Sequence, residues 1–157
     1  MFDYIEIAGE KGHDQLPWQP IADSQDEDYQ PHSLPSIVVS ILSRLDAPPR
    51  LVAHLELVHD VAIELVDGIL AAFPGIEVDS EAIRIGAATH DIGKVKHRNE
   101  LTAPGNRHEF DGASILLDSG LPALFARFTR THGAWSTEEL PLDDLLVALS
   151  DTIWKGK

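Results

Sequence analysis

The side chains of this sequence that could do chemistry are mainly histidine and aspartate. The chain contains eight histidines, and one of them, His90, stands directly before Asp91 in the stretch AATHDIGK. An imidazole beside a carboxylate can cap a helix and form a hydrogen bond, or both side chains can bind one metal ion. The dipeptide alone fits both roles.

Other residues could join this pair. Asp151 lies inside the apolar segment LLVALSDTIW, where an isolated carboxylate would be costly to bury without a cation or water. His54 and His59 lie at opposite borders of the apolar face of one long predicted helix, so the helical pattern favours neither. Side chains from five separate helices could thus meet at one site, which is how helical domains build metal centres. The candidates are His54, His90, Asp91, His108, His132 and Asp151.

The composition restricts the metal and the partners. The chain has no cysteine, so nitrogen and oxygen ligands must hold any metal, which favours iron, manganese, magnesium or zinc. A net charge of −14 repels nucleic acid, and we expect no extended nucleic-acid partner. Four of the 12 basic residues nevertheless cluster near the His-Asp pair, which favours a small phosphorylated ligand over a merely solvated loop. These are Lys94, Lys96, Arg98 and Arg107.

The residues from 36 to 157 are predicted to form an all-α domain of about six helices, preceded by an extended arm over residues 1–35. The sequence allows the arm to lie against the domain, to mediate assembly such as a homodimer, or to stay mobile. No apolar run approaches the roughly 18 residues of a membrane span. We expect no membrane partner, and a cytoplasmic protein, because cysteines and an N-terminal signal segment are both absent.

Local signals place the ends of these helices. Asp79 or Ser80 can cap the third, which Gly93 ends. Asn106 and Glu109 form a pair similar to a capping box at the start of the fourth. The predicted helices are, in order, SLPSIVVSILSRL, RLVAHLELVHDVAIELVDGILAAF, EAIRIGAATHD, HEFDGASILLDSG, PALFARFTRTH and PLDDLLVALSDTIW.

The candidate ligands, in this order and with these spacers, resemble the HD-domain superfamily of metal-dependent phosphohydrolases over about residues 50–157. The segment HLELVHDVA matches the first histidine of the family with its following Val and Ala, which selects His54 over His59. THDIGK matches the signature pair. HEFDGASIL, THGAW and ALSDTIWKGK match the segments that carry His108, His132 and Asp151. The resemblance implies an HD-domain helical bundle.

The two additional histidines resemble the family variant that binds two metal ions. The resemblance implies two divalent ions per chain, iron or manganese, with magnesium, zinc, nickel and cobalt as alternatives. Asp91 would bridge the ions, and a hydroxide shared between them would attack phosphorus in line with the leaving oxygen. The implied ligands are His54, His90 and Asp151 for one ion, and His108 and His132 for the other.

The function expected from this resemblance is enzymatic hydrolysis of a phosphoester or phosphoanhydride in a nucleotide or another small phosphorylated metabolite. Asp91 and Lys94 are the expected catalytic residues, with Lys94 neutralising a phosphate oxygen in the transition state. Lys94 is also a candidate for substrate binding. So are Trp135, which could stack on a base, and Arg130 and Lys155, which are close in sequence to metal ligands.

Two other functions fit the same ligands. Some family members use two irons and dioxygen to cleave a small polyol or a phosphonate. A non-catalytic domain could keep the metal as a structural or ligand-binding element, although a complete ligand set argues against a decayed site. Cyclic-di-GMP phosphodiesterases of the family usually have a second histidine where this chain has Gly133, and their GYP element is absent. Family members usually continue beyond the point, six residues after Asp151, where this sequence stops, so the substrate stays undefined.

Overall fold

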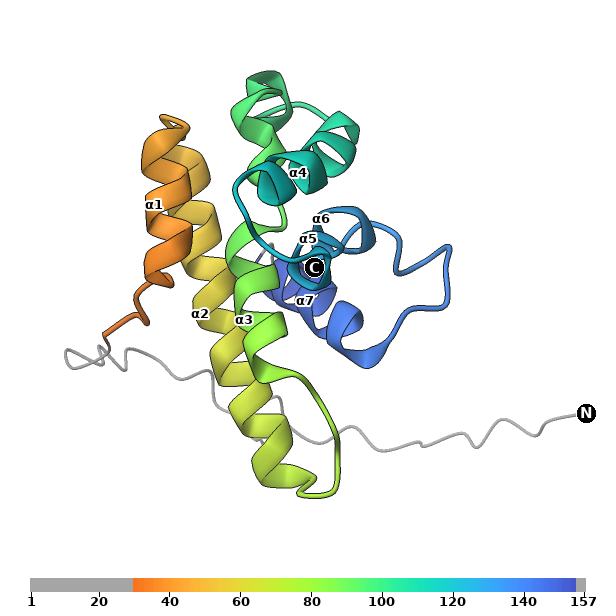
Figure 1. The fold of residues 1–157 in the computed structure, drawn as a ribbon. Coiled ribbons are helices and arrows are strands. Elements are labelled where there is room, and N and C mark those ends of the chain that lie inside the picture. The colour runs from red at the N-terminus through yellow and green to blue at the C-terminus, as the bar shows by residue number, and fades with distance from the viewer. Residues whose placement is uncertain (1–29, 155–157) are drawn as a thin grey trace, which may run out of the picture. The chain divides into compact units, whose positions relative to one another are not determined.

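Helices form all the regular structure of residues 30–154, the part of the chain that the computed structural model describes (Figure 1). The α-helices are α1 (Ser36–Arg44), α2 (Pro49–Ala72), α3 (Ser80–Thr89), α4 (Arg107–Asp118), α5 (Ala123–Ala126), α6 (Phe128–Thr131) and α7 (Leu142–Trp154). Two 3-10 helices, η1 (Ile92–Val95) and η2 (Arg98–Leu101), connect α3 to α4. The all-α prediction is confirmed for these residues. The predicted arm lies largely outside them, and its residues 30–35 are not helical.

Two predicted helices differ from the observed ones. The segment from Pro122 forms two short helices, α5 and α6, separated at Arg127, whose backbone is still helical with φ −59° and ψ −36°. Helix α3 ends at Thr89 rather than at Gly93, because the chain tightens into η1 directly after the His-Asp pair. The pair therefore lies at a junction of two helix types, where its side chains can turn in one direction.

The predicted helix caps are half right. Asp79 caps α3, since its carboxylate accepts a hydrogen bond from the Ala82 N–H at 2.9 Å. Asn106 precedes α4, but its side chain forms no capping hydrogen bond, so the predicted capping box is wrong. The Glu109 side chain instead faces a cavity beside the candidate ligands.

Helices α2, α3 and α7 contact one another and form the centre of the bundle. Helices α2 and α3 run side by side along much of their length (Figure 1). One hydrophobic cluster joins α1 and the start of α2 to α4, and includes Leu51, Leu55 and Leu116. The other joins the later part of α2 to α7, and includes Val58, Phe128 and Val147. The candidate ligand His54 lies on α2 between Leu51 of the first hydrophobic cluster and Val58 of the second.

Helix α4 approaches η1 so closely that Gly93 has no room for a side chain. A Cβ atom at this position would overlap the His108 carbonyl oxygen and lie 2.8 Å from the Gly112 nitrogen. The buried Gly93 thus brings the backbone that follows the His-Asp pair against the start of α4. The glycine of THDIGK serves this close approach rather than helix termination.

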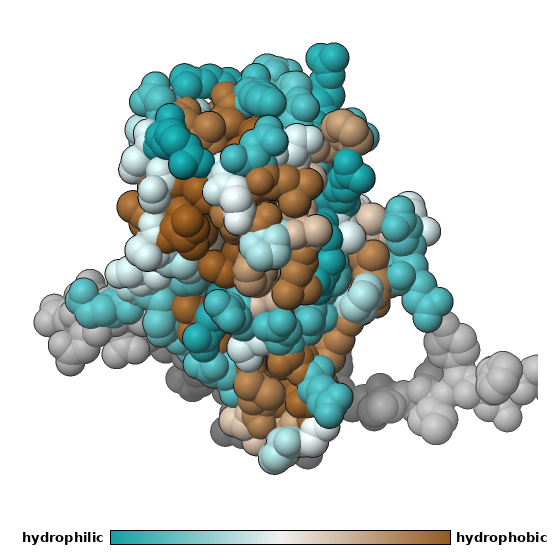
Figure 2. Space-filling model, in the orientation of Figure 1, coloured by the Kyte–Doolittle hydropathy of each residue, from teal (hydrophilic) through white to brown (hydrophobic). Residues whose placement is uncertain are grey.

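The segment before α1 is held to α2 by Asp60. One carboxylate oxygen of Asp60 accepts hydrogen bonds from the His32 backbone N–H and from its ring Nδ1, both at 2.8 Å. Asp60 is therefore buried, while Glu56 and Glu64 on the same face of α2 are exposed. On the face seen in Figure 2, hydrophobic residues reach the surface among hydrophilic ones. Across residues 30–154, no helix is both long and apolar enough to cross a membrane.

Candidate metal centre

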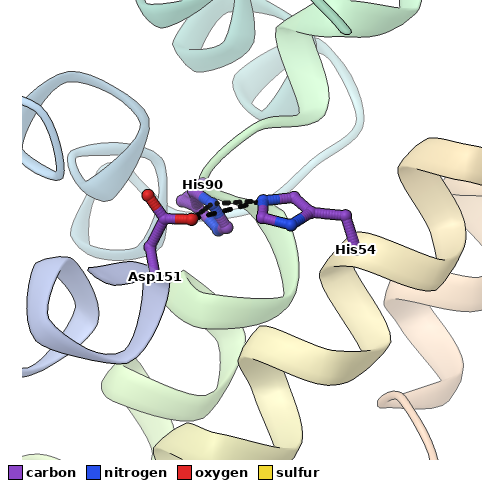
Figure 3. Close-up of side chains that lie close together, drawn as sticks. All are labelled: His54, His90 and Asp151. Carbon is purple, nitrogen blue, oxygen red and sulfur yellow. Dashed lines mark hydrogen bonds and ion pairs between the residues drawn. The ribbon is translucent and has the colours of Figure 1, made fainter. Parts of the chain in front are cut away.

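Side chains from α2, α3 and α7 meet at the middle of the bundle. The His54 Nε2 and His90 Nε2 atoms are 3.2 Å apart, and Asp151 Oδ1 lies 3.4 Å from the first and 3.6 Å from the second (Figure 3). Ligand atoms of these three residues all lie within 4.8 Å of one another. His90 is fully buried, so the group is closed on the side of α3. Two imidazoles and a carboxylate at this spacing can hold one metal ion.

The two oxygens of Asp91 face different histidines. Its Oδ2 lies 3.1 Å from His54 Nε2 and 3.6 Å from His90 Nε2. Its Oδ1 lies 3.0 Å from His108 Nε2 and 3.5 Å from His132 Nε2. Asp91 therefore stands between two pairs of imidazoles, which is the arrangement a carboxylate needs in order to bridge two ions.

The other ring nitrogens of three histidines are held by acceptors. His90 Nδ1 donates to the Ala87 carbonyl at 2.9 Å, and His132 Nδ1 donates to the Phe128 carbonyl at 3.1 Å. His108 Nδ1 donates to the buried Glu100 carboxylate at 2.6 Å. These bonds place the proton on Nδ1, so each Nε2 can offer a lone pair to a metal.

Two buried polar atoms of this group of side chains lack a hydrogen-bond partner within the described residues. Asp91 Oδ1 and His108 Nε2 lie 3.0 Å apart, yet neither makes a hydrogen bond of acceptable geometry within the described residues. Buried polar atoms are nearly always paired, and the exceptions call for an explanation such as an ion. A cation between these atoms would satisfy both, so the residues fit a metal.

Burial and charge oppose each other in this cluster. Burial lowers the pKa of His90, but the nearby Asp91 and Asp151 outweigh it, and the pKa is raised. Burial disfavours ionised Asp91, but the charge of His90 and the nearby imidazoles of His108 and His54 hold its pKa well below the usual range. Burial and the charge of His90 lower the pKa of His132 to about 4. Ionised Asp91 is thus stabilised by positive charge beside it, which Lys94 and a proton on His90 can supply and which a metal ion would also supply.

Two cavities open onto the cluster, and both are lined by Asp91 and Lys94. The Arg50 cavity, of about 420 Å³, is lined by Arg50, Ala53, His54, Leu57, Asp91, Lys94 and Leu101. The Trp135 cavity, of about 560 Å³, is lined by Asp91, Lys94, Glu100, Ala103, Pro104, Gly105, His108, Glu109, His132, Gly133, Trp135, Asp151 and Thr152. Lys94 Nζ lies 2.5 Å from Asp91 Oδ2 and so puts a positive charge between the two openings.

The structure separates the predicted substrate residues. Lys94 and Trp135 line the cavities, whereas Arg130 lines neither and lies with its guanidinium 4.5 Å from the centre of the Phe110 ring. The predicted substrate-binding role of Arg130 rested on its closeness in sequence to His132. Residues at positions i and i+2 of a helix, however, point in different directions. Lys155 lies outside the described residues. His97 pairs with Asp111 at 2.5 Å and lines neither cavity.

His59, the other histidine near the first-ligand position, lies away from the cluster. It is 2% exposed, and its Nδ1 has no hydrogen-bond partner within the described residues. Burial lowers its pKa to about 4, aided by the nearby His32 and Arg84. It is therefore a neutral core histidine at neutral pH.

Sequence patterns did not identify three further residues of the site. Arg50 is one helical turn before His54, so helical spacing could have placed both on one face. Glu109 has a ligand atom within 4.8 Å of those of His108 and His132, but the pattern assigned it to a helix cap. Burial raises the pKa of its carboxyl. Glu100, which orients His108, carries no signal that a single sequence reveals.

Comparison with known proteins gives a single result. No curated protein and no solved structure matches the chain. The family model of the HD domain matches residues 51–153, a range that contains every residue of the candidate metal centre. Proteins of this family are generally metal-dependent hydrolases. With a match over more than half of its length, the chain belongs to the HD domain family.

Proposed function

We propose that this protein is a metal-dependent phosphohydrolase that cleaves a phosphoester or phosphoanhydride in a nucleotide or another small phosphorylated metabolite. The observation that carries the proposal is the position of Asp91, with one oxygen facing His54 and His90 and the other facing His108 and His132. A centre for two ions, bridged by one carboxylate, is the arrangement that many phosphate-ester hydrolases use.

The residues of the centre would have separate roles as metal ligands and as a partner that orients a ligand. His54, His90 and Asp151 would hold one ion, and His108 and His132 the other, with Asp91 between them. When bound, such ions supply Lewis acidity toward phosphoryl oxygens and lower the pKa of water. Glu100 would keep the His108 ring oriented, because its carboxylate fixes the Nδ1 proton on the side away from the centre.

Positive side chains beside the cluster support an anionic substrate. Lys94 and Arg50 line the same cavity as Asp91, and the Arg50 guanidinium forms no hydrogen bond or ion pair with the described residues. A phosphate group in the Arg50 cavity would therefore meet a cation that no carboxylate of residues 30–154 neutralises. Lys94 could move from Asp91 to a phosphoryl oxygen once metal ions compensate the carboxylate. Trp135, 54% exposed at the Trp135 cavity, is suited to stack on a base.

The test combines metal analysis with two activity assays. The wild-type protein, purified without chelator, is expected to contain divalent metal and to release phosphate from one or more members of a panel of nucleotides and phosphoesters. Asp91→Asn should lose bound metal, and its phosphate release should fall by more than the roughly 10–100-fold that loss of an outer partner costs. Asp67→Asn, at an exposed position on α2, is the matched control and should retain both.

Oxygen uptake in place of phosphate release would overturn the proposed hydrolase function. Two irons per chain, with oxygen consumed on a polyol or phosphonate and no phosphate released, would show an HD-domain oxygenase instead. Metal bound tightly by wild type and by Asp67→Asn, lost from Asp91→Asn, and accompanied by neither activity would show a non-catalytic metal-binding domain. Full metal content in Asp91→Asn would remove Asp91 from the centre altogether.

A further inference from the structure

Glu109 is an acidic side chain of the centre that the family ligand pattern does not include. It follows His108 on α4, and its carboxylate lines the Trp135 cavity beside His108 and His132. Ligand atoms of these three residues all lie within 4.8 Å of one another, and those of His54, His90 and Asp151 are equally close. Within the described residues the Glu109 carboxylate forms no hydrogen bond and no ion pair.

The chain leaves room for this carboxylate next to His132. A Cβ atom at Gly133 would lie 2.8 Å from Glu109 Oε1, closer than such contacts occur in proteins. A side chain at position 133 would therefore require the flexible end of Glu109 to shift. Gly133 leaves this space beside His132 to the Glu109 carboxylate.

The two halves of the centre are unequal without Glu109. The half built by His54, His90 and Asp151 has two imidazoles and a carboxylate of its own. The half built by His108 and His132 has two imidazoles and no carboxylate besides the shared Asp91. We infer that Glu109 is a ligand of the second ion, so that each ion has two imidazoles, one carboxylate of its own and one oxygen of Asp91. This inference rests on the proposed two-ion centre.

A carboxylate at this position has chemical consequences. It reduces the net positive charge of the ion pair, and it makes the second site richer in oxygen, which favours manganese, iron or magnesium over softer ions. It also fills a coordination position that would otherwise be open to solvent from the Trp135 cavity.

The test uses Glu109→Gln, which keeps the shape of the side chain and removes its charge. Protein freed of metal with a chelator is titrated with Mn²⁺ by calorimetry, and the Mn²⁺ spectrum is recorded by electron paramagnetic resonance. Wild type should bind two ions and show the spectrum of a coupled pair. Glu109→Gln should bind the first ion as wild type does, bind the second at least about 10-fold more weakly, and show an isolated ion at one equivalent per chain.

Two more variants make the result specific. Glu64→Gln, at an exposed position on α2, controls for loss of one negative charge and should match wild type. Glu109→Asp retains a carboxylate and should bind the second ion more tightly than Glu109→Gln, which a general loss of folding would not produce. Two ions bound by Glu109→Gln with wild-type affinities would overturn the inference and leave the proposed function intact. One ion or none in wild type would overturn the two-ion centre itself.

Discussion

Histidines in this chain serve opposite purposes, and burial alone does not distinguish them. His90 and His59 are both buried, yet His90 lies beside the carboxylates of Asp91 and Asp151, whereas His59 lies near His32 and Arg84. The pKa of His90 is accordingly raised, whereas that of His59 is lowered to about 4. The direction of the pKa shift does not mark the ligands, since the pKa of His132 is also lowered to about 4. What the four histidines of the centre share is an Nε2 atom within 3.6 Å of an Asp91 oxygen.

His59 should make the stability of the fold depend on pH. Its pKa is about 4 when folded and near 6.5 when exposed, so between these values the unfolded chain binds more protons. The free energy of unfolding should fall as pH decreases from 6.5 to 4, by at most about 3 kcal/mol from this residue. His59→Leu should remove that contribution. Urea unfolding at pH 7 and pH 4.5, in the presence of chelator, measures the difference.

The comparison isolates the contribution of position 59, because all the other histidines are present in both proteins. Wild type should lose more stability than His59→Leu between the two pH values. Equal losses would mean that His59 can be protonated in the folded protein at little cost.

Residue types and order were enough to nominate six ligands, and Asp151 was the most informative because a lone carboxylate in an apolar helix needs a cation. They were not enough for Glu109. A glutamate three residues after an asparagine is a common helix-start pattern, and only the position of the side chain shows that it faces the cavity. Arg130 shows the converse, since closeness in sequence to His132 did not bring it to a cavity.

At the scale of elements, the centre depends on a close contact between η1 and α4. The buried Gly93 allows the backbone after the His-Asp pair to lie against the carbonyl of His108. Asp91 and His108 therefore belong to segments whose separation is set by a single missing side chain. Helix boundaries were predicted well where proline or aspartate marks them, but this contact is between distant segments and has no local signal.

Gly93→Ala should disturb both stability and metal binding. Its methyl group would overlap the His108 carbonyl oxygen, and such overpacking typically costs about 1–3 kcal/mol or more. Separation of η1 from α4 should also weaken binding of the second Mn²⁺ ion. Thermal unfolding and Mn²⁺ titration measure the two effects.

Gly68→Ala is the matched control. Gly68 lies within α2, and a Cβ atom there would have nothing within 4 Å, so alanine should stabilise the protein by about 0.5–1 kcal/mol. Gly93→Ala with the stability and second-ion affinity of wild type would show that η1 and α4 can separate without cost.

At the scale of the whole molecule, the centre connects helices that pack into different hydrophobic clusters. Helix α7, which carries Asp151, packs into one cluster and α4, which carries His108, into the other, while α2, which carries His54, contributes to both. Metal ions would therefore join both halves of the bundle. Without them, ionised carboxylates and partly charged imidazoles are held together in the interior at an electrostatic cost.

Removal of metal should consequently lower the thermal stability of the whole domain. With free metal at about 1,000 times its dissociation constant, binding stabilises the folded state by about 4 kcal/mol, equivalent to roughly 8–16 °C for a domain of this size. Scanning calorimetry with Mn²⁺ and with chelator measures the shift, and Asp91→Asn should show almost none. A wild-type midpoint that does not respond to Mn²⁺ would contradict a metal that bridges the bundle.

The two cavities bear on the order of events in the proposed hydrolysis. Both reach Asp91, but one is bordered by Arg50 and the other by Trp135. If the phosphate is held beside Arg50 and the rest of the substrate beside Trp135, the two products would lie in different cavities after cleavage. Either product would then be free to leave while the other stays bound, without passing across the Asp91 carboxylate.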